Sequence, residues 1–260
     1  MNNVNKTLYI PLYGKAYVSK KGIILHDSKA ESIWDKEGFE LKGKSKSKWL
    51  AYNMGMRSAV FDKLVKKEIN ETSDCTVLHI GCGMDSRAER IGASDIRWYD
   101  IDFPDVIAER QKYYKETGFY RMIAADARQV HWLKNLPTRK AIVILEGISM
   151  YFTPEEMKTL LKALTDHFAA VTIFMDCYTV RAAKASKYKN PINDVGVTTV
   201  YGIDDPCTFE DRTNLSYVRE HNMTPPEMIQ ELKGMERFFF KTVFGGKLAK
   251  KIYRMYEYRK

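Results

Sequence analysis

The 260-residue sequence lacks several features that would place it in a special class of protein. No apolar run approaches the roughly 20 residues that are needed to span a bilayer. The first 15 residues, MNNVNKTLYIPLYGK, lack the apolar core of a signal peptide. There is also no internal repeat and no low-complexity segment. These absences predict a cytoplasmic globular protein that has no membrane partner.

Cysteine is scarce, and its four copies are widely separated. Cys75, Cys82, Cys177 and Cys207 form no C-x-x-C pair of the kind that binds zinc or carries out redox chemistry. We therefore expect reduced, mostly buried thiols and no metal site.

Acidic residues are fewer than basic ones, and the formal net charge is +9. The excess of positive charge is confined to the two ends of the chain. Residues 1–72 carry +6 and residues 241–260 carry +6, whereas the segment between them carries −3. The densest basic run, KGKSKSK at 42–48, is typical of a solvated surface. This distribution predicts no nucleic-acid partner, although a nucleic-acid methyltransferase would account for basic ends.

The middle of the chain alternates apolar β-branched runs with helical patterns, which predicts an α/β fold with a mostly parallel sheet and helices on both faces. We expect strands at 75–80, 96–101, 120–125, 141–146 and 171–176, and a long helix over 47–69. The sequence divides into a helical cap (1–72), a Rossmann-like cofactor core (73–180), an aperiodic lid or substrate insertion (181–223) and a C-terminal completion of the sheet (224–260). In this last region RFFFKTVF, at 237–244, predicts a strand.

Glycines and acidic residues stand at the ends of the predicted strands. VLHIGCGMDSR, at 77–87, indicates a buried strand that ends in a turn with Gly81 and Gly83, and Asp102, Asp126 and Glu146 close later strands. Ligands of open parallel sheets bind at these carboxyl ends. The turn lacks the third glycine of G-x-G-x-x-G and contains an aspartate, which disfavours a pyrophosphate. Carboxylates that can hold ribose hydroxyls and face a positive centre favour S-adenosylmethionine over NAD.

Two charged residues near this edge allow more than one interpretation. Arg57 falls on the apolar stripe of its helix, where it either forms a structural ion pair or binds the carboxylate of the cofactor. If the ligand is its anion, removing Arg57 leaves the stability of the empty protein unchanged or higher. Asp85 either binds the cofactor or is the N-cap of the following helix.

At this point the sequence resembles the leucine carboxyl methyltransferase family, in particular its bacterial polyketide-pathway O-methyltransferases. The likeness runs from about residue 8 to residue 178, through blocks such as LYIPLYGKAYVSKKGIILHDSKAESI, MRSAVFDKLV, VLHIGCGMDSRAERIG, IRWYDIDFPDVIAERQKYY, YRMIAADARQVHWL and VILEGISMYFTPEEMKTLL. It implies the class I methyltransferase fold with S-adenosylmethionine as cofactor.

Carried over residue by residue, the resemblance implies cofactor contacts at the positions already singled out. Arg57 matches the arginine that binds the cofactor carboxylate, and Gly81 matches the glycine of the first motif. Asp102 matches the aspartate on the ribose hydroxyls. The remaining matches are Asp126 with Ala127 beside the adenine, where the family often has Asp-Leu, and Glu146 near the amino group and the sulfonium. Lys15 stands where relatives often have arginine, which leaves its role open.

The resemblance also implies that the methyl acceptor is a carboxylate or an acidic hydroxyl of a small molecule. Polyketide-like compounds belong to this class. Tyr151 is expected in the wall of its pocket, since aromatic rings suit a sulfonium. His221 is the histidine that a lid could deliver as a general base, and Lys15, Arg128 and Arg181 are candidates to meet an acceptor's negative charge. Alternatives are a nicotinamide oxidoreductase, a protein C-terminal carboxyl methyltransferase and a non-catalytic cofactor-binding module.

Overall fold

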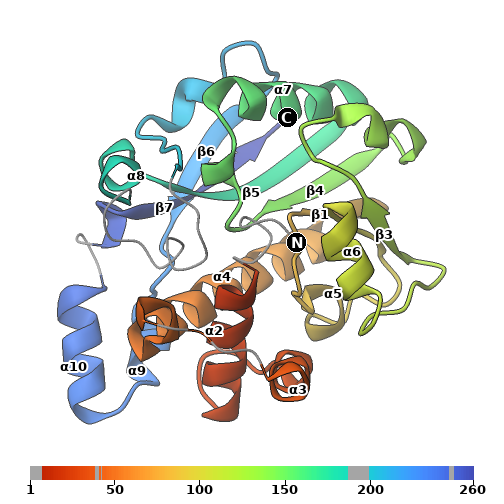
Figure 1. Cartoon of the computed structure of the whole chain (residues 1–260). Coiled ribbons are helices and arrows are strands. Elements are labelled where there is room, and N and C mark those ends of the chain that lie inside the picture. The colour runs from red at the N-terminus through yellow and green to blue at the C-terminus, as the bar shows by residue number, and fades with distance from the viewer. Residues whose placement is uncertain (1–7, 39–40, 42, 187–198, 246–248) are drawn as a thin grey trace.

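A single sheet of seven strands organises the protein, with the strand order β3-β2-β1-β4-β5-β7-β6. The computed structural model describes residues 8–38, 41, 43–186, 199–245 and 249–260 (Figure 1). β1 to β5 are mutually parallel, and β7 runs antiparallel to both β5 and β6. The strands are β1 (Cys75–Ile80), β2 (Arg97–Asp102), β3 (Tyr120–Ala124), β4 (Lys140–Leu145), β5 (Ala170–Tyr178), β6 (Ser216–His221) and β7 (Tyr253–Arg259).

Helices cover both faces of this sheet, α7 on one and α4 on the other (Figure 1). Because side chains alternate along a strand, Val77 packs on the face of Phe61 from α4, whereas Leu78 packs on the face of Leu160 from α7. The helices are α2 (Tyr9–Lys20), α3 (Ser28–Glu37), α4 (Lys48–Glu71), α5 (Arg87–Arg90), α6 (Pro104–Arg110), α7 (Pro154–His167), α8 (Val180–Ser186), α9 (Pro226–Gln230) and α10 (Gly234–Val243). Short 3₁₀ turns are η1 (Gly43–Lys46), η2 (Val130–Asn135), η3 (Ser149–Tyr151) and η5 (Pro206–Phe209).

The N-terminal helices pack closely against α4, below the sheet in Figure 1. A Cβ atom added at Gly14 of α2 would lie 2.5 Å from Cβ of Met54 on α4, so a residue with a side chain would force the two helices apart. This close approach places the neighbouring Lys15 of α2 beside the carboxyl ends of the strands.

The five strands expected in the middle of the chain are confirmed, with ends that differ by at most two residues. The central strands β1, β4 and β5 are largely apolar because both faces of the sheet are covered there. The strand expected over 237–244 is wrong, since 237–243 belong to α10 and Phe244 is its C-cap. In α10, Phe240 is fully buried while Phe238 is 68% exposed. Three consecutive phenylalanines raise the β-propensity of the segment, but only one side of it meets the core.

The segment 181–223 contains more regular structure than its lack of periodicity indicates. η5 and all of α8 except Val180 lie in it, and residues 216–221 form β6, an edge strand that pairs with β7. An edge strand with polar residues on its open side shows little apolar alternation, which explains why the pattern missed it. Residues 187–198 of the predicted lid lie outside the described residues. The division into four regions stays a prediction.

Candidate functional site

The candidate residues meet at the carboxyl edge of the sheet, around one cavity of about 660 Å³. Because β6 runs in the same direction as β5, its last residue reaches this edge together with the ends of β1, β2 and β4. The cavity is lined by the ten residues expected to bind the cofactor or to take part in catalysis: Arg57, Gly81, Gly83, Asp85, Asp102, Asp126, Ala127, Glu146, Tyr151 and His221. The structure therefore brings them together, and their individual roles are proposals.

The glycine turn after β1 has a conformation that depends on glycine. Gly81 has a φ angle of 71°, and a Cβ atom there would lie 2.1 Å from Cγ2 of Ile148. The turn is tied to the end of β2, because the Gly83 amide donates to Asp102 Oδ2 at 2.8 Å. The Phe103 amide donates to Asp102 Oδ1 at 2.8 Å. Burial raises the pKa of Asp102 above its usual value, although these two amides favour the ionised form.

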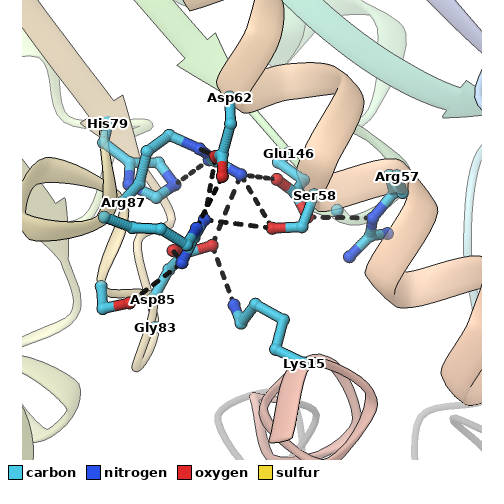
Figure 2. Close-up of polar contacts among 12 residues, drawn as sticks. Lys15, Arg57, Ser58, Asp62, His79, Gly83, Asp85, Arg87 and Glu146 are labelled. Carbon is cyan, nitrogen blue, oxygen red and sulfur yellow. Dashed lines mark hydrogen bonds and ion pairs between the residues drawn. The ribbon is translucent and has the colours of Figure 1, made fainter. Parts of the chain in front are cut away.

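Glu146, after β4, is clamped between two arginines (Figure 2). Arg57 Nε lies 3.0 Å from its Oε1, and Arg87 Nη2 binds its Oε2. Burial alone would raise the pKa of Glu146, but the guanidinium groups of Arg87 and Arg57 outweigh it and lower that pKa to about 2. Glu146 is therefore ionised at all physiological pH values, and its charge is already paired.

Arg57 has a second carboxylate partner in Asp176 of β5, with 3.5 Å between Nη1 and Oδ2. The Gly147 amide holds the other oxygen of Asp176 at 2.7 Å. Burial, with a further contribution from Glu146, raises the pKa of Asp176 to about 6 although Arg57 opposes the shift. The hypothesis that Arg57 lacks an anion until a ligand binds is wrong, because the protein itself supplies two.

Asp85 is not an N-cap, since the N-cap of α5 is Ser86. Its buried carboxylate lies 2.8 Å from Lys15 Nζ and 3.5 Å from Arg87 Nη2 (Figure 2). It also lies 3.1 Å from Arg90 Nη1. Burial raises the pKa of Asp85, but these three cations lower it well below its usual range. Lys15, whose role the sequence left open, thus connects α2 to the strand ends through this ion pair.

Arg87 is the central residue that sequence analysis missed. It is fully buried, and it binds Asp62 Oδ1 at 2.7 Å and Ser58 Oγ at 3.0 Å as well as Glu146 (Figure 2). Arg90, one turn further on α5, binds the other oxygen of Asp62 at 2.6 Å. The signal that could have pointed to these residues in the sequence is a pair of arginines, three residues apart, directly after the glycine turn. Their partners on α4 lie more than twenty residues away in sequence and are visible only in the fold.

Asp126 lies at the cavity rim and is held by a side chain two residues away. Arg128 Nε lies 2.9 Å from Oδ1, and Arg128 Nη2 lies 2.8 Å from Oδ2. Partial burial raises the pKa of Asp126, but hydrogen bonds from Arg128 lower it below its usual value. Lys15 and Arg128 both line the cavity, whereas Arg181 is exposed on α8 and is not among the lining residues, so its expected placement is wrong.

Tyr151 and His221 also line the cavity. Tyr151 lies in η3. His221 is the last residue of β6, and its Nε2 lies 2.8 Å from Oε2 of Glu257 on β7. The hypothesis that a lid delivers His221 is wrong, because the sheet itself holds the residue. Apolar and aromatic residues that line the same cavity include Leu50, Met54, Met150, Tyr178, Phe244 and Ile252.

Other expectations about the chain concern its thiols, metals and membranes. Cys75, Cys82 and Cys177 are buried free thiols and Cys207 is an exposed one, which confirms the prediction of mostly buried thiols. Within the described ranges, no three histidine, cysteine, aspartate or glutamate side chains converge as a metal site would require. No helix in the described part of the chain is long and apolar enough to cross a membrane.

The strand order, the reversed β7 and the cavity at the carboxyl edge define a class I S-adenosylmethionine-dependent methyltransferase fold. Solved structures support this fold: magnesium protoporphyrin IX methyltransferase from Synechocystis PCC 6803, with bound SAH, has a TM-score of 0.51 at 11% identity and covers 90% of this chain and 94% of its own. The mycolic acid cyclopropane synthase CmaA1 also has a TM-score of 0.51 at 11% identity, covering 77% and 83%.

The chain belongs to the leucine carboxyl methyltransferase family, whose model matches residues 7–165. It is similar to the tetracenomycin polyketide synthesis O-methyltransferase TcmP of Streptomyces glaucescens, at 26% identity over 92% of this chain and 90% of the relative. It is also similar to the S-adenosyl-L-methionine-dependent methyltransferase dpfgK of Gibberella zeae, at 25% identity over 81% and 78%. The predicted family, fold class, methyltransferase activity and S-adenosylmethionine cofactor are thereby confirmed.

Proposed function

We propose that this methyltransferase transfers the methyl group of S-adenosylmethionine to an oxygen of a small organic molecule, either a carboxylate or an acidic hydroxyl. The observation that carries the proposal is one cavity that is lined by the glycine turn, the strand-end carboxylates and a set of apolar and aromatic residues. Its volume, about 660 Å³, is in the range of small-molecule sites, roughly 300–1,000 Å³. The polyketide O-methyltransferase among its relatives supports an acceptor of this size.

The residues present fit the cofactor. The turn at Gly81 and Gly83 presents backbone rather than side chains, which allows a ligand to approach closely. Asp102 is an acceptor-only carboxylate, fixed by two amides, that suits a pair of ribose hydroxyls. Asp126 with Ala127 would border the adenine. Bound there, the cofactor supplies an electrophilic methyl group on a sulfonium.

The amino-acid end of the cofactor would lie toward Arg57 and Glu146. Arg57 has five N–H donors, of which Nε binds Glu146, so its outer nitrogens can also bind a ligand carboxylate. Glu146 is held ionised by two arginines, and a carboxylate in this state accepts hydrogen bonds from a ligand ammonium. Tyr151 would form part of the wall near the sulfonium. In this arrangement the protein orients two reactants and excludes water, which supplies much of the acceleration.

The proposed cofactor contacts are tested by calorimetry on Asp102→Ala. Loss of a charged acceptor of ribose hydroxyls costs about 2 kcal/mol, so SAH should bind roughly 30-fold more weakly. Asp95→Ala is the matched control, because Asp95 is exposed and does not line the cavity. Equal affinity of the Asp102 variant and the wild type would refute the assignment. Binding of NADH but not of SAH by the wild type would instead support an oxidoreductase.

A further inference from the structure

The histidine at the cavity is hydrogen-bonded to a buried carboxylate. His221 Nε2 lies 2.8 Å from Glu257 Oε2, and Glu257 is only 4% exposed. The ring also packs edge-on against Phe174 of β5, with 6.2 Å between ring centroids. The hydrogen bond between the two strands and the ring contact therefore fix the position of this imidazole. His221 lines the same cavity as the glycine turn.

Glu257 is fixed in turn by a chain of charged groups that reaches α4. Arg259 Nε lies 2.8 Å from Glu257 Oε1, and Arg259 Nη2 lies 2.6 Å from Oε2 of Glu68 on α4. Arg219, on β6, approaches Glu257 Oε2 at 3.6 Å. Burial raises the pKa of Glu257, but Arg259 and His221 outweigh it and lower that pKa below its usual value. Glu257 is therefore an ionised carboxylate, which can only accept hydrogen bonds.

This charge state decides the tautomer of the neutral imidazole. An acceptor-only carboxylate at Nε2 requires that Nε2 carry the proton, which leaves the lone pair on Nδ1 of His221. In the part of the chain that the structure describes, the hydrogen bond of this ring runs through Nε2 to Glu257, and none is found at Nδ1. The pair has the arrangement in which a carboxylate orients a histidine base and stabilises the imidazolium that forms.

We propose that Glu257 is a positioning residue for His221, and that His221 Nδ1 removes the proton of an un-ionised aromatic hydroxyl. The methyl acceptor is therefore a phenol-type compound. The proposal depends on the methyltransferase function proposed above. The acceptor's O–H bond breaks as its proton passes to Nδ1, and the oxygen forms a bond to the methyl carbon. The sulfur–methyl bond breaks and its electron pair stays on sulfur, giving SAH and a methyl ether. The imidazolium then returns the proton to solvent.

One chemical argument and one observation favour a hydroxyl over a carboxylate as the methyl acceptor. A phenol has a pKa of about 10, so at neutral pH it needs a base, whereas a carboxylate has no proton to give. In addition, every lysine and arginine among the described cavity-lining residues is already paired with a carboxylate. The pairs are Lys15 with Asp85, Arg57 with Glu146, Arg128 with Asp126, and Lys250 with Glu220 at 3.0 Å. Each lining cation in this set already has a carboxylate partner, and the outer nitrogens of Arg57 are assigned above to the carboxylate of the cofactor, which leaves a second anion poorly neutralised.

The tautomer is tested first, by nitrogen-15 NMR of the wild-type protein saturated with SAH. His221→Gln identifies the signals of His221 among the five histidines of the chain. We expect the neutral form of His221 to be protonated on Nε2, and Glu257→Gln to shift the tautomer ratio toward Nδ1–H. Glu227→Gln, on the exposed surface of α9, is the control and should change nothing. A wild-type His221 protonated mainly on Nδ1 would overturn the positioning role.

The acceptor class is tested with 3-hydroxy-2-naphthoic acid, which carries a hydroxyl and a carboxylate on one scaffold, and with 2-naphthol. The label of methyl-labelled S-adenosylmethionine should enter a product that survives alkaline hydrolysis, because an aryl ether is stable where a methyl ester releases methanol. kcat/KM should rise with pH, and His221→Gln should remove this rise and lower kcat/KM about 100-fold or more. Glu257→Gln should lower kcat about tenfold with unchanged SAH affinity.

An alkali-labile product, or a His221→Gln variant as active as the wild type, would overturn the hydroxyl assignment. So would the absence of methylation of both probes by protein that binds SAH. A failure of the underlying function is distinguishable: without the cofactor site the wild-type protein would not bind SAH, and as a non-catalytic module it would bind SAH but transfer no label to any acceptor, a carboxylate included.

Discussion

Asp176 offers a quantitative test of the buried charges at the site. The perturbation is Asp176→Asn, which keeps an oxygen to accept the Gly147 amide at 2.7 Å but removes the titratable group. In the folded protein, burial and the nearby Glu146 raise the pKa of Asp176 from 3.8 to about 6. An aspartate in the unfolded chain titrates near its ordinary value, about 3.9. The two states of the protein therefore bind different numbers of protons between these pKa values.

The sign and the size of the effect follow from this difference. Because the pKa is raised on folding, the contribution of Asp176 to stability is fully present below its unfolded pKa and is lost as the pH rises through about 6. The whole loss is about 3 kcal/mol, since each pKa unit corresponds to roughly 1.4 kcal/mol. Between pH 5 and pH 7 the integrated share is about 1 kcal/mol. Wild-type protein should therefore lose about 1 kcal/mol more than Asp176→Asn over that interval.

The assay is urea unfolding of both proteins, without ligand, at pH 5 and pH 7, with the free energy of unfolding extrapolated to water. All other titratable groups, including the five histidines, are common to the two proteins, so the difference of the two pH effects isolates Asp176. Equal pH effects in the two proteins would refute the raised pKa. A larger loss in the variant would show that Asp176 is stabilised in its ionised form.

Two further predictions concern the ion pairs of Arg57 and the packing of α10. Arg57→Ala should lower the free energy of unfolding of the ligand-free protein by about 3 kcal/mol, because Glu146 and Asp176 lose their shared buried partner; an unchanged Tm in thermal unfolding would contradict this. In α10, Phe240→Ala should cost about 3 kcal/mol or more by leaving a core cavity. Phe238→Ala should stay within about 0.5 kcal/mol, since its side chain is 68% exposed. Similar losses in urea for both variants would contradict the helical interpretation.

The sheet and the acidic side of the site could be predicted from the sequence for one physical reason. A strand covered on both faces must be apolar over its whole length, as CTVLHI and AIVILE are, so its ends are visible in the pattern. Parallel strands end at the same edge, so the residues that follow them are neighbours whatever the details of packing. Asp102 and Glu146 were found by that argument alone.

The ion pairs of the cationic residues could not be predicted, because these residues come from different elements. Lys15 lies on α2, Arg57 on α4 and Arg87 on α5, and each meets its carboxylate only when the helices pack on the sheet. Spacing placed Arg57 on an apolar stripe but gave no partner for it. The pair of His221 with Glu257 is equally hidden, because it joins β6 to β7 across 36 residues of sequence. Local patterns carry no information about such contacts.

The net charge of the ion-paired cluster around Asp85 and Glu146 influences which ligand the site favours. Among the described residues it contains five carboxylates and four cations, connected by the ion pairs of Figure 2 and their extensions: Asp27, Asp62, Asp85, Glu146 and Asp176 with Lys15, Arg57, Arg87 and Arg90. One negative charge is in excess when all are ionised. In a site of low dielectric this excess attracts a cation such as a sulfonium or an ammonium. It repels the pyrophosphate of a dinucleotide, so the electrostatics and the missing third glycine both favour S-adenosylmethionine over a nicotinamide cofactor in this fold.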